Sequence, residues 1–504
     1  MLASVHSGAL WGVESLAVAV EVNTGERGEL RLVLVGLPDA AVKESLDRVC
    51  SALQNSKFKL PHTRTTINLS PGHIRKEGPM YDLPIAIGVL LASGQINGSA
   101  SDFLIAGELS LSGKVLPIRG AVALAIQAKR QGLRGVLLPK TSAKEAVLID
   151  GIDIYGVESL GEVARFLEKR DSLQPLPHEK WETGSYGDLD FSDIRGQELA
   201  KRAAEVAVAG GHNLVMVGCP GVGKSMIAKR LPTIMPPPTL DELIEIRAIH
   251  STAGTFFSDS QLSIGRPFRA PHHTISRVGL VGGGSNPRPG EISLAHNGIL
   301  FLDELAEFAR NTLESLRQPL DDGFVSISRS IGKVRFPSSF TLVAAMNPCP
   351  CGYLGSKKRR CTCSRKQICD YRSRISGPLL DRMDMHIDVP SVSPEIFAGQ
   401  TYGETSEQIR IRVAAARERQ KKRFAGKKIY CNARIPDGLV RKFCVLGAEE
   451  TDLVKCAMDQ GALSARACGR VLRVARTIAD ICDCENIIPF HILEALQYRL
   501  LDIT

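Results

Sequence analysis

A glycine-rich octapeptide constrains this chain more than any other stretch. Residues 218–225 read Gly-Cys-Pro-Gly-Val-Gly-Lys-Ser, the pattern of a phosphate-binding loop. The apolar run Leu214–Val217 before it predicts a buried strand, and Met226–Leu231 after it predicts a helix. In this setting, backbone N–H groups cradle phosphate oxygens, the lysine reaches the β- and γ-phosphates, and the serine binds Mg²⁺. The pattern predicts a nucleotide site made of Gly218, Cys219, Pro220, Gly221, Val222, Gly223, Lys224 and Ser225.

The composition indicates several globular domains without export or membrane segments. The 504 residues suffice for two to four domains, and 44% hydrophobic and 23% charged residues are ordinary values for globular proteins. We find no apolar run long enough to cross a membrane and no N-terminal export signal, so we expect a cytoplasmic protein with reduced cysteines. The net charge of +9 is compatible with a polyanionic partner.

The pattern of apolar residues divides the chain into an α/β part and a helical tail. Residues 1–168 form a first domain, and 169–190, rich in Pro, Gly and Ser from residue 172 onward, form a linker. A nucleotide-binding core occupies 191–400, and a helical lid with an interruption at Tyr430–Pro436 occupies 401–504. The first domain has predicted strands at Ala17–Val22, Leu30–Val35 and Arg64–Leu69, and predicted helices at Asp39–Gln54, Pro84–Ser93 and Gly120–Gln131.

Two further strand ends complete a set of residues for nucleotide hydrolysis. Ile299–Leu302 is an apolar run followed by Asp303, which would hold Mg²⁺, and Glu304, which would act as general base toward water. Such an acidic pair often caps a helix, but after a phosphate-binding loop the catalytic interpretation is favoured. A third strand ends at Asn347, whose amide would orient the attacking water, although an Asn before a Pro is also typical of turns.

The order of these motifs resembles that of AAA+ ATPases, and two arginines fit the same order. Arg382, in the segment Gly377–Asp384, resembles the arginine finger that acts on the nucleotide of a neighbouring subunit. Arg466, in Leu463–Ala467, resembles the second sensor arginine of a helical lid. Taken singly, each arginine is better explained as a surface charge or an ion-pair partner, but their order in the chain favours the two site roles.

Three longer motifs resemble the ComM/YifB group of magnesium-chelatase-like AAA+ ATPases, and the resemblance covers essentially the whole chain. The motifs are Arg266–His273, Gly290–Gly298 and Asn347–Gly352. The resemblance implies ATP and Mg²⁺ as cofactors and a homo-hexameric ring. It also implies a DNA helicase that drives branch migration in the homologous recombination of incoming DNA during natural transformation, with recombination proteins as further partners.

Two basic segments are candidates for contact with single-stranded or branched DNA. The chain between the phosphate-binding loop and Ile299–Leu302 is too long for one helix and one strand. The excess, roughly His250–Glu291, resembles the helix-2 insertion whose loops line the pore of related rings. Val325–Val334 predicts a β-hairpin. Basic loops in a pore bind phosphates without reading sequence, although an ordinary surface charge explains any single arginine about equally well. The candidates are Arg266, Arg269, Arg277, Arg288, Arg329, Lys333 and Arg335.

Five of the thirteen cysteines lie between Cys349 and Cys369. Two Cys-x-Cys pairs, Cys349 with Cys351 and Cys361 with Cys363, suit a tetrahedral Zn²⁺ site, and the basic residues between them favour thiolates. Cys-x-Cys is a less usual spacing than Cys-x-x-Cys, so reduced thiols in a loop remain the alternative. Cys369 is either a bystander or a substitute ligand.

The first domain resembles the proteolytic domain of Lon proteases in Lys76–Met80, Gly113–Gly120 and Gly135–Lys140. That domain uses a Ser–Lys dyad. At the corresponding positions this chain has Met80 and Val122, which can neither attack a carbonyl nor take up a proton. We therefore expect a Lon-like α+β fold without peptidase activity.

Three functions remain in competition. The leading one is an ATP-driven DNA branch-migration helicase, the second is a chelatase motor that inserts Mg²⁺ into a tetrapyrrole through partner subunits, and the third is an assembly protein with a silent nucleotide site. The Lon-like domain and the cysteines disfavour the second function, because chelatase motor subunits are usually shorter and lack both. The complete set Lys224, Asp303, Glu304, Asn347 and Arg382 disfavours the third.

Overall fold

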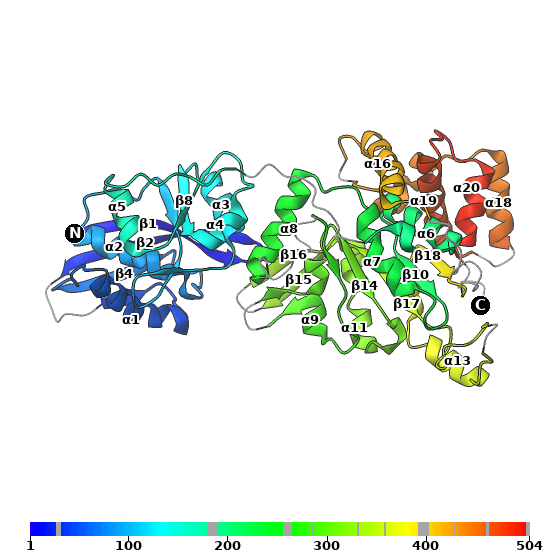
Figure 1. Cartoon of the computed structure of the whole chain (residues 1–504), viewed down its shortest axis with the longest axis horizontal. Helices are drawn as coiled ribbons and strands as arrows, with labels where there is room; N and C mark the ends of the chain where they lie inside the picture. Colours follow the sequence, from blue (N-terminus) through cyan, green and yellow to red (C-terminus); the bar gives the residue numbers. More distant parts are fainter. Residues whose placement is uncertain are drawn as a thin grey trace.

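The computed structural model arranges three parts of the chain in a row (Figure 1). The N-terminal domain forms one end, the nucleotide-binding core the middle, and the helical lid lies against the core at the other end. Among the described residues, no helix is long and apolar enough to cross a membrane. The structure describes residues 1–26, 32–178, 189–255, 265–284, 287–329, 332–356, 359–391, 403–427, 429–459 and 463–499.

The N-terminal domain is built on a seven-stranded sheet with the order β3-β4-β2-β1-β5-β8-β9. Its first two strands form a long antiparallel hairpin, and β1 then pairs in parallel with β5. The predicted strands and helices of this domain are present, with Asp39 capping α1 through the backbone N–H of Val42. The strands are β1 (Leu2–Trp11), β2 (Glu14–Glu26), β3 (Leu32–Val35), β4 (Arg64–Ser70), β5 (Phe103–Ile105), β8 (Gly135–Pro139) and β9 (Asp153–Val157). The helices are α1 (Ala40–Asn55), α2 (Asp82–Ala92), α3 (Ala121–Arg130), α4 (Lys140–Ala146) and α5 (Leu160–Leu167).

The two positions that correspond to the Lon dyad are part of the hydrophobic core of this domain. Met80 lies just before α2 and is 6% exposed, and Val122 lies in the first turn of α3 and is 1% exposed. Both side chains pack in the same apolar cluster. The positions that carry a nucleophile and a base in Lon therefore serve packing here.

The nucleotide-binding core contains a five-stranded parallel sheet with the order β11-β14-β17-β10-β18. Three of its strands are completely buried, as expected for a parallel sheet covered by helices on both faces. Because all strands run in the same direction, their carboxyl ends share one edge. The strands are β10 (Leu214–Val217), β11 (Phe268–Arg269), β14 (Ile299–Leu302), β17 (Thr341–Met346) and β18 (Met385–Asp388).

The C-terminal lid is helical, as predicted, and its core is continuous with one face of the sheet. The predicted interruption contains only a short 3-10 helix at Asn432–Arg434. Helix α6 (Glu198–Gly210) of the core packs against two lid helices. The lid helices are α16 (Ser406–Arg423), α17 (Asp437–Phe443), α18 (Ala448–Asp459), α19 (Ala465–Ile481) and α20 (Pro489–Gln497).

The insertion within the core is shorter than the sequence suggested. Helix α8 (Leu240–Ala253) extends past His250, residues 256–264 lie outside the described part, and Phe268–Arg269 is the edge strand β11 of the main sheet. A two-residue strand has no periodic pattern of apolar residues, so the sequence does not distinguish β11 from the insertion. The inserted elements are α9 (Arg277–Val281), β12 (Gly282–Gly283), β13 (Arg288–Pro289) and α10 (Glu291–Leu294).

Two contacts join the N-terminal domain to the core. Helix α8 packs on α3, and its Ala248 belongs to the hydrophobic core of the N-terminal domain. The backbone N–H of Gly120 donates to the Ser251 oxygen at 3.0 Å, and the Ser251 hydroxyl donates to Glu145. The β1–β2 turn forms the second contact, against the predicted hairpin of β15 (Phe324–Arg329) and β16 (Gly332–Pro337). At that turn Gly12 has a φ of 67°, and a Cβ there would lie 2.8 Å from Val334.

Candidate active site

The phosphate-binding loop connects β10 to the start of helix α7 (Lys224–Ile234). Gly221 and Gly223 have φ angles of 77° and 97°, in the left-handed region that side chains disfavour. This backbone turns successive N–H groups toward the position in front of the helix, where the positive end of the helix dipole adds to their effect. The local geometry is that of an anion cradle, as the sequence predicts.

Lys224 is buried at the centre of this cradle, with 8% of its surface exposed. Its Nζ donates to the carbonyl oxygens of Gly218 at 2.6 Å and Cys219 at 3.0 Å, and to Asn347 Oδ1 at 3.3 Å. Burial lowers the pKa of the ammonium group, and the charge of Asp303 opposes that shift. The ammonium group is thus surrounded by oxygen atoms of the protein. A nucleotide phosphate would offer it oxygen partners of the same kind.

Ser225 and Asp303 lie together although Ser225 belongs to helix α7 and Asp303 follows strand β14. The Ser225 hydroxyl donates to Asp303 Oδ2 at 2.6 Å, because α7 begins beside the carboxyl end of β14. Asp303 Oδ1 accepts a hydrogen bond from the backbone N–H of Glu304 at 3.0 Å, which fixes the carboxylate. Two adjacent oxygen ligands beside a phosphate cradle are what a nucleotide-bound Mg²⁺ requires, so these residues fit the predicted metal.

Glu304 points away from the hydrophobic core. Its side chain is 56% exposed, and its backbone adopts a φ of 52°, in the sparsely populated left-handed region. His273 lies beside it, with its Nδ1 3.5 Å from Glu304 Oε2. A carboxylate that is exposed beside the cradle is available to accept a proton from water.

His273 has a place in the site that we did not predict from the sequence. It follows β11, which pairs with β14, so the sheet brings it to the residue after Asp303. Its ring stacks against His272 with centroids 4.1 Å apart. The signal that could have placed His273 in the site is its position shortly after strand β11. That strand has only two residues and could not be recognised in the sequence.

Asn347 lies where the sequence predicts, at the carboxyl end of β17. This strand sits between β14 and β10, so its end falls between Asp303 and the phosphate-binding loop. The amide oxygen contacts the Lys224 ammonium. The structure therefore brings Lys224, Ser225, Asp303, Glu304 and Asn347 together at one edge of the sheet.

Arg382 lies at the opposite edge of the same sheet. It precedes β18, and its backbone oxygen accepts a hydrogen bond from Asn213 Nδ2 at 2.9 Å, at the amino end of β10. Its guanidinium group is bound to Asp321, with Nε 3.0 Å from both carboxylate oxygens. Strand β10 thus separates Arg382 from the phosphate-binding loop of its own chain.

Arg466 is exposed near the start of α19. One helical turn further on, Arg470 is paired with Asp384 at 3.2 Å, and Asp384 lies two residues after Arg382. The two predicted arginines therefore occupy the same region, on the side of the sheet away from Lys224.

Arg266 and Arg269, two of the predicted DNA contacts, both form contacts within the chain. Arg266 is 8% exposed and donates to the backbone oxygens of Pro236 at 2.6 Å and Asn297 at 2.7 Å. It also pairs with Glu242 at 2.9 Å. Arg269 forms a two-pronged ion pair with Glu291, at 2.7 and 3.0 Å. These guanidinium groups hold β11 to its neighbours, and their contact with DNA stays a prediction.

The other basic candidates lie on the surface. Arg277, at the start of α9, and Arg288, in β13, are exposed. Lys333 and Arg335 are exposed on one face of the β15–β16 hairpin, and Arg335 lies over the Phe324 ring at 4.8 Å. The side chain of Arg329 lies outside the described residues.

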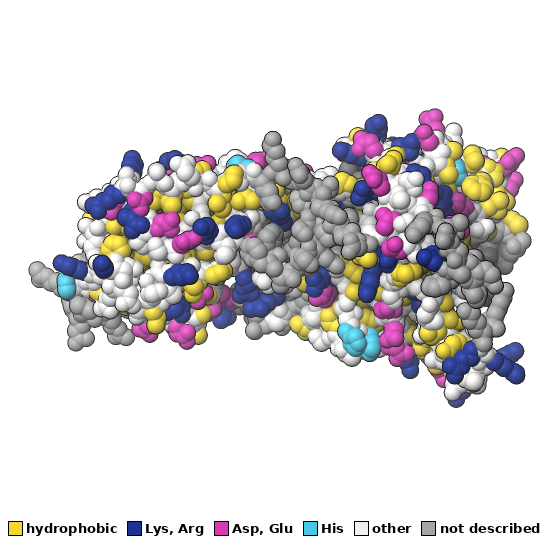
Figure 2. Space-filling model, in the orientation of Figure 1, with side chains coloured by type: hydrophobic (Ala, Val, Ile, Leu, Met, Phe, Trp, Pro, Cys, Tyr) yellow, Lys and Arg dark blue, Asp and Glu magenta, His cyan; other side chains and the backbone are white. Residues whose placement is uncertain are grey.

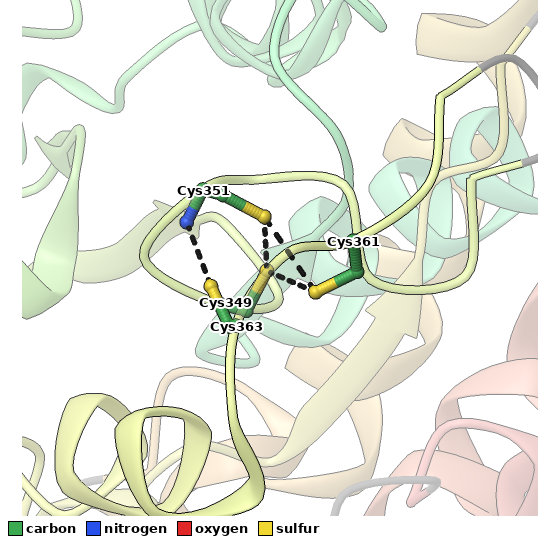
Figure 3. Close-up of side chains that lie close together, drawn as sticks. All are labelled: Cys349, Cys351, Cys361 and Cys363. Atoms are coloured by element: carbon green, nitrogen blue, oxygen red, sulfur yellow. Dashed lines mark hydrogen bonds between the residues drawn. The ribbon is translucent and has the colours of Figure 1, made fainter.

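The two Cys-x-Cys pairs converge into one cluster, hereafter the cysteine cluster: Cys349, Cys351, Cys361 and Cys363 (Figure 3). The Cys349 sulfur lies 3.4 Å from that of Cys351 and 3.7 Å from that of Cys361, and the last two are 3.6 Å apart. The Cys363 sulfur accepts from the backbone N–H of Cys351 at 3.4 Å. Backbone N–H groups of Thr362 and Tyr353 lower the pKa of the Cys351 thiol.

Comparisons with known proteins match the chain along its whole length. Family models for the magnesium chelatase subunit ChlI match residues 190–397 and 20–142, and a model for its C-terminal part matches 403–499. The YifB protein of Salmonella typhimurium is 42% identical over 504 residues, covering 99% of this chain and 97% of YifB. The competence protein ComM of Haemophilus influenzae is 43% identical over 511 residues, with the same coverage. The Lon protease of Citrifermentans bemidjiense is 27% identical over 186 residues, 34% of this chain and 23% of that protease.

Proposed function

The chain belongs to the ComM/YifB family of magnesium-chelatase-like AAA+ ATPases, and from this premise we propose that it is a ring-forming DNA motor driven by ATP hydrolysis. In its most specific form, the proposal is a cytoplasmic helicase that drives branch migration during homologous recombination of incoming DNA in natural transformation. The name of the Haemophilus relative, a competence protein, supports that form.

One observation carries the motor proposal: Lys224 and the proposed finger Arg382 lie at opposite edges of the sheet. Lys224 lies after the carboxyl end of β10, whereas Arg382 is bound at its amino end. Arg382 can therefore serve a nucleotide only on a second subunit, which requires repeated head-to-tail contacts. A closed ring, proposed here as a hexamer, meets that requirement. Arg466 lies in the same region as Arg382 and is proposed to reach the same nucleotide.

Within each site, the chain's residues have distinct tasks. Lys224 binds the β- and γ-phosphates, and the Ser225 and Asp303 oxygens hold Mg²⁺, which neutralises phosphate charge when it is bound. The Asn347 amide orients the attacking water. A carboxylate oxygen of Glu304 accepts the proton of that water.

The proposed DNA contacts are cations that have no acidic partner in the described chain. Arg277, Arg288 and Lys333 form no ion pair among the residues described, and Arg335 lies over the Phe324 ring. Burial and the nearby charge of Arg288 lower the pKa of Arg119. Clustered cations of this kind favour a polyanion. Arg329 is also proposed to contact DNA, and this proposal rests only on its position at the end of β15 in the hairpin.

A further basic surface lies beside the cysteine cluster. Arg359, Arg360, Arg365 and Lys366 are all exposed at or before the start of helix α13 (Arg365–Arg372). Figure 2 shows Lys and Arg side chains gathered at this end of the molecule. We propose it as a second place where phosphates bind.

The decisive experiment measures ATP hydrolysis by the purified protein alone, with linear single-stranded DNA and with a branched DNA junction. We expect DNA to stimulate hydrolysis and the junction to be moved in an ATP-dependent way. The Lys224→Ala variant, which should hydrolyse no ATP, is the control. If DNA neither binds nor stimulates hydrolysis, the DNA motor is wrong, even if ATP is still hydrolysed.

The second candidate, a chelatase-type motor, is favoured by the names of the matching family models. It predicts Mg²⁺ insertion into a tetrapyrrole when partner subunits are supplied, and no response to DNA. Hydrolysis that responds to the tetrapyrrole system but not to DNA would decide for it.

A further inference from the structure

The spacing of the four sulfurs in the cysteine cluster matches that of a tetrahedral metal centre. A Zn–S bond of about 2.3 Å places the sulfurs of a regular tetrahedron about 3.8 Å apart. The sulfur–sulfur separations of 3.4, 3.6 and 3.7 Å are close to this value, and all four sulfurs lie within 4.8 Å of one another. A disulfide needs about 2.05 Å, so the sulfurs converge without being bonded.

We propose that the cysteine cluster binds a structural Zn²⁺ ion, and that this ion holds the adjoining backbone against the phosphate-binding loop. Four sulfur ligands leave no open position for water or substrate, which is the pattern of a structural site and not of a catalytic one. Binding forms four Zn–S bonds, and the remaining thiol protons go to solvent without any oxidation or reduction.

The surroundings of the cluster fit a metal that organises backbone. Cys349 is completely buried, and the other three cysteines are partly exposed. The second pair leads directly into Ser364, whose side chain caps α13 through the backbone N–H of Gln367. The cluster thus joins the end of strand β17, where Asn347 lies, to the beginning of helix α13.

The cluster also touches the nucleotide site through backbone and side chain. Cys349 is the second residue after Asn347, which contacts Lys224. Gly352 has a φ of 82° and lies so close to Pro220 of the phosphate-binding loop that a Cβ there would be 2.7 Å from the proline ring. Losing the metal would therefore free both Asn347 and one wall of the phosphate cradle, and nucleotide binding would have to restore their order.

The first test is metal content, measured on the full-length protein by mass spectrometry after gel filtration without chelator. We expect one zinc per chain in the natural protein and far less than one in Cys361→Ser. Cys369→Ser is the matched control, because Cys369 is nearby and exposed but lies outside the cluster. Equal zinc in Cys361→Ser and in the natural protein overturns the site, and stoichiometric iron in place of zinc overturns its assigned metal.

A second measurement uses the natural sequence loaded with Co²⁺, so it does not require that a cysteine variant folds. Protein produced with Co²⁺ should show the strong visible absorption of cobalt held by four thiolates, and added Zn²⁺ should abolish it. Absence of that spectrum from cobalt-loaded, folded protein overturns the proposal.

The link to the nucleotide site is tested by ADP binding, followed by titration calorimetry. Zinc removal by a chelator, or Cys361→Ser, should weaken ADP binding by about tenfold through the added ordering of the loop, whereas Cys369→Ser should leave it unchanged. Unchanged ADP binding after verified zinc loss overturns the link. Neither readout involves DNA, so these outcomes are separate from those that test the DNA motor.

Discussion

The side chain of Asn213 donates a hydrogen bond of 2.9 Å to the backbone oxygen of Arg382, and Asn213 directly precedes β10. The same strand ends at the phosphate-binding loop. One short strand therefore fixes the distance between the phosphate-binding loop and Arg382, which we propose belong to two different composite sites.

This arrangement predicts complementation between two inactive variants. Arg382→Ala and Lys224→Ala should each lose hydrolysis, by about a thousandfold for the arginine. Mixed rings should recover part of it, because Lys224 of an Arg382→Ala subunit meets Arg382 of a Lys224→Ala subunit. Hydrolysis is measured after mixing and reassembly at varied ratios. Arg317→Ala, which removes an ion pair with Glu314, is the control and should remain active alone. Failure of all mixed ratios, with rings formed, would mean that Arg382 does not act across the interface.

Glu304→Gln should separate nucleotide binding from hydrolysis. Losing the proton acceptor should lower kcat by about a hundredfold to ten-thousandfold, whereas ATP binding, carried by Lys224 and the loop, should persist. Single-turnover kinetics and ADP affinity check this prediction. Glu307→Gln is the matched control, since Glu307 is exposed, lies three residues away and pairs with Arg374. Hydrolysis retained in Glu304→Gln would assign the base to another residue.

His273 should act by positioning Glu304. Its Nδ1 lies 3.5 Å from the Glu304 carboxylate, so His273→Ala should lower kcat by about tenfold, the lower end of effects for such supporting partners. KM for ATP should remain within about twofold, because phosphate contacts are intact. His273→Gln should recover part of the loss. His272→Ala, which removes the stacked neighbour, should affect kcat less, and an equal loss in both variants would indicate a general packing effect.

Arg266 and Lys333 should have opposite effects on stability and DNA binding. Arg266→Ala leaves Glu242 and two backbone oxygens without their buried cation and should lower the free energy of unfolding by about 3 kcal/mol. Lys333→Ala should leave the free energy of unfolding unchanged. It should lower the slope of log DNA affinity against log salt concentration by about one, the effect of one lost phosphate contact. Urea melts and DNA titrations at several salt concentrations check both. A salt slope changed only by Arg266→Ala would reverse the assignment.

Glu145 should make the domain contact sensitive to pH. Burial raises the pKa of this carboxyl group to about 7, although its hydrogen bond from Ser251 acts the other way. The unfolded value is about 4.3, so the neutral form favours the folded state. The resulting stability is complete below about pH 4 and is lost as the pH rises through about 7, by up to about 3 kcal/mol.

Urea unfolding at several pH values compares the natural protein with Glu145→Gln. The variant should show a smaller decline in stability from about pH 5 to about pH 8. Glu198→Gln, an exposed carboxylate paired with Lys201, is the control and should behave like the natural protein. Parallel curves for all three proteins would contradict the prediction.

The parts of the site that the sequence predicted are those encoded by adjacent residues. A phosphate-binding loop requires glycines at fixed positions, and Asp303 and Asn347 follow apolar runs that can be recognised locally. The contacts of Arg266 within the chain were not predicted, because its partners, Pro236 and Asn297, are remote in the sequence. Its basic character is visible in the sequence, but its burial depends on how β11 joins the sheet.

The contact between Glu304 and His273 was missed for the same reason. It depends on β11 and β14 being neighbours, and a two-residue strand gives no periodic signal. The convergence of the cysteine cluster was predicted, because the spacing of the pairs is itself a local signal. Its proximity to Pro220 could not be, since that contact joins two loops at the ends of different strands.

Helix α8 belongs to the nucleotide-binding core by sequence, yet one of its faces completes the interior of the N-terminal domain. A protease cut or a gene truncation between the two domains would therefore expose apolar surface at Ala248 and Ile244 on one fragment and leave a hollow in the other. Neither fragment would be a self-sufficient module. The Lon-like domain and the ATPase core are thus bound to be inherited, expressed and degraded as one unit, and an exchange of either by recombination between genes would have to carry the α8 surface with it.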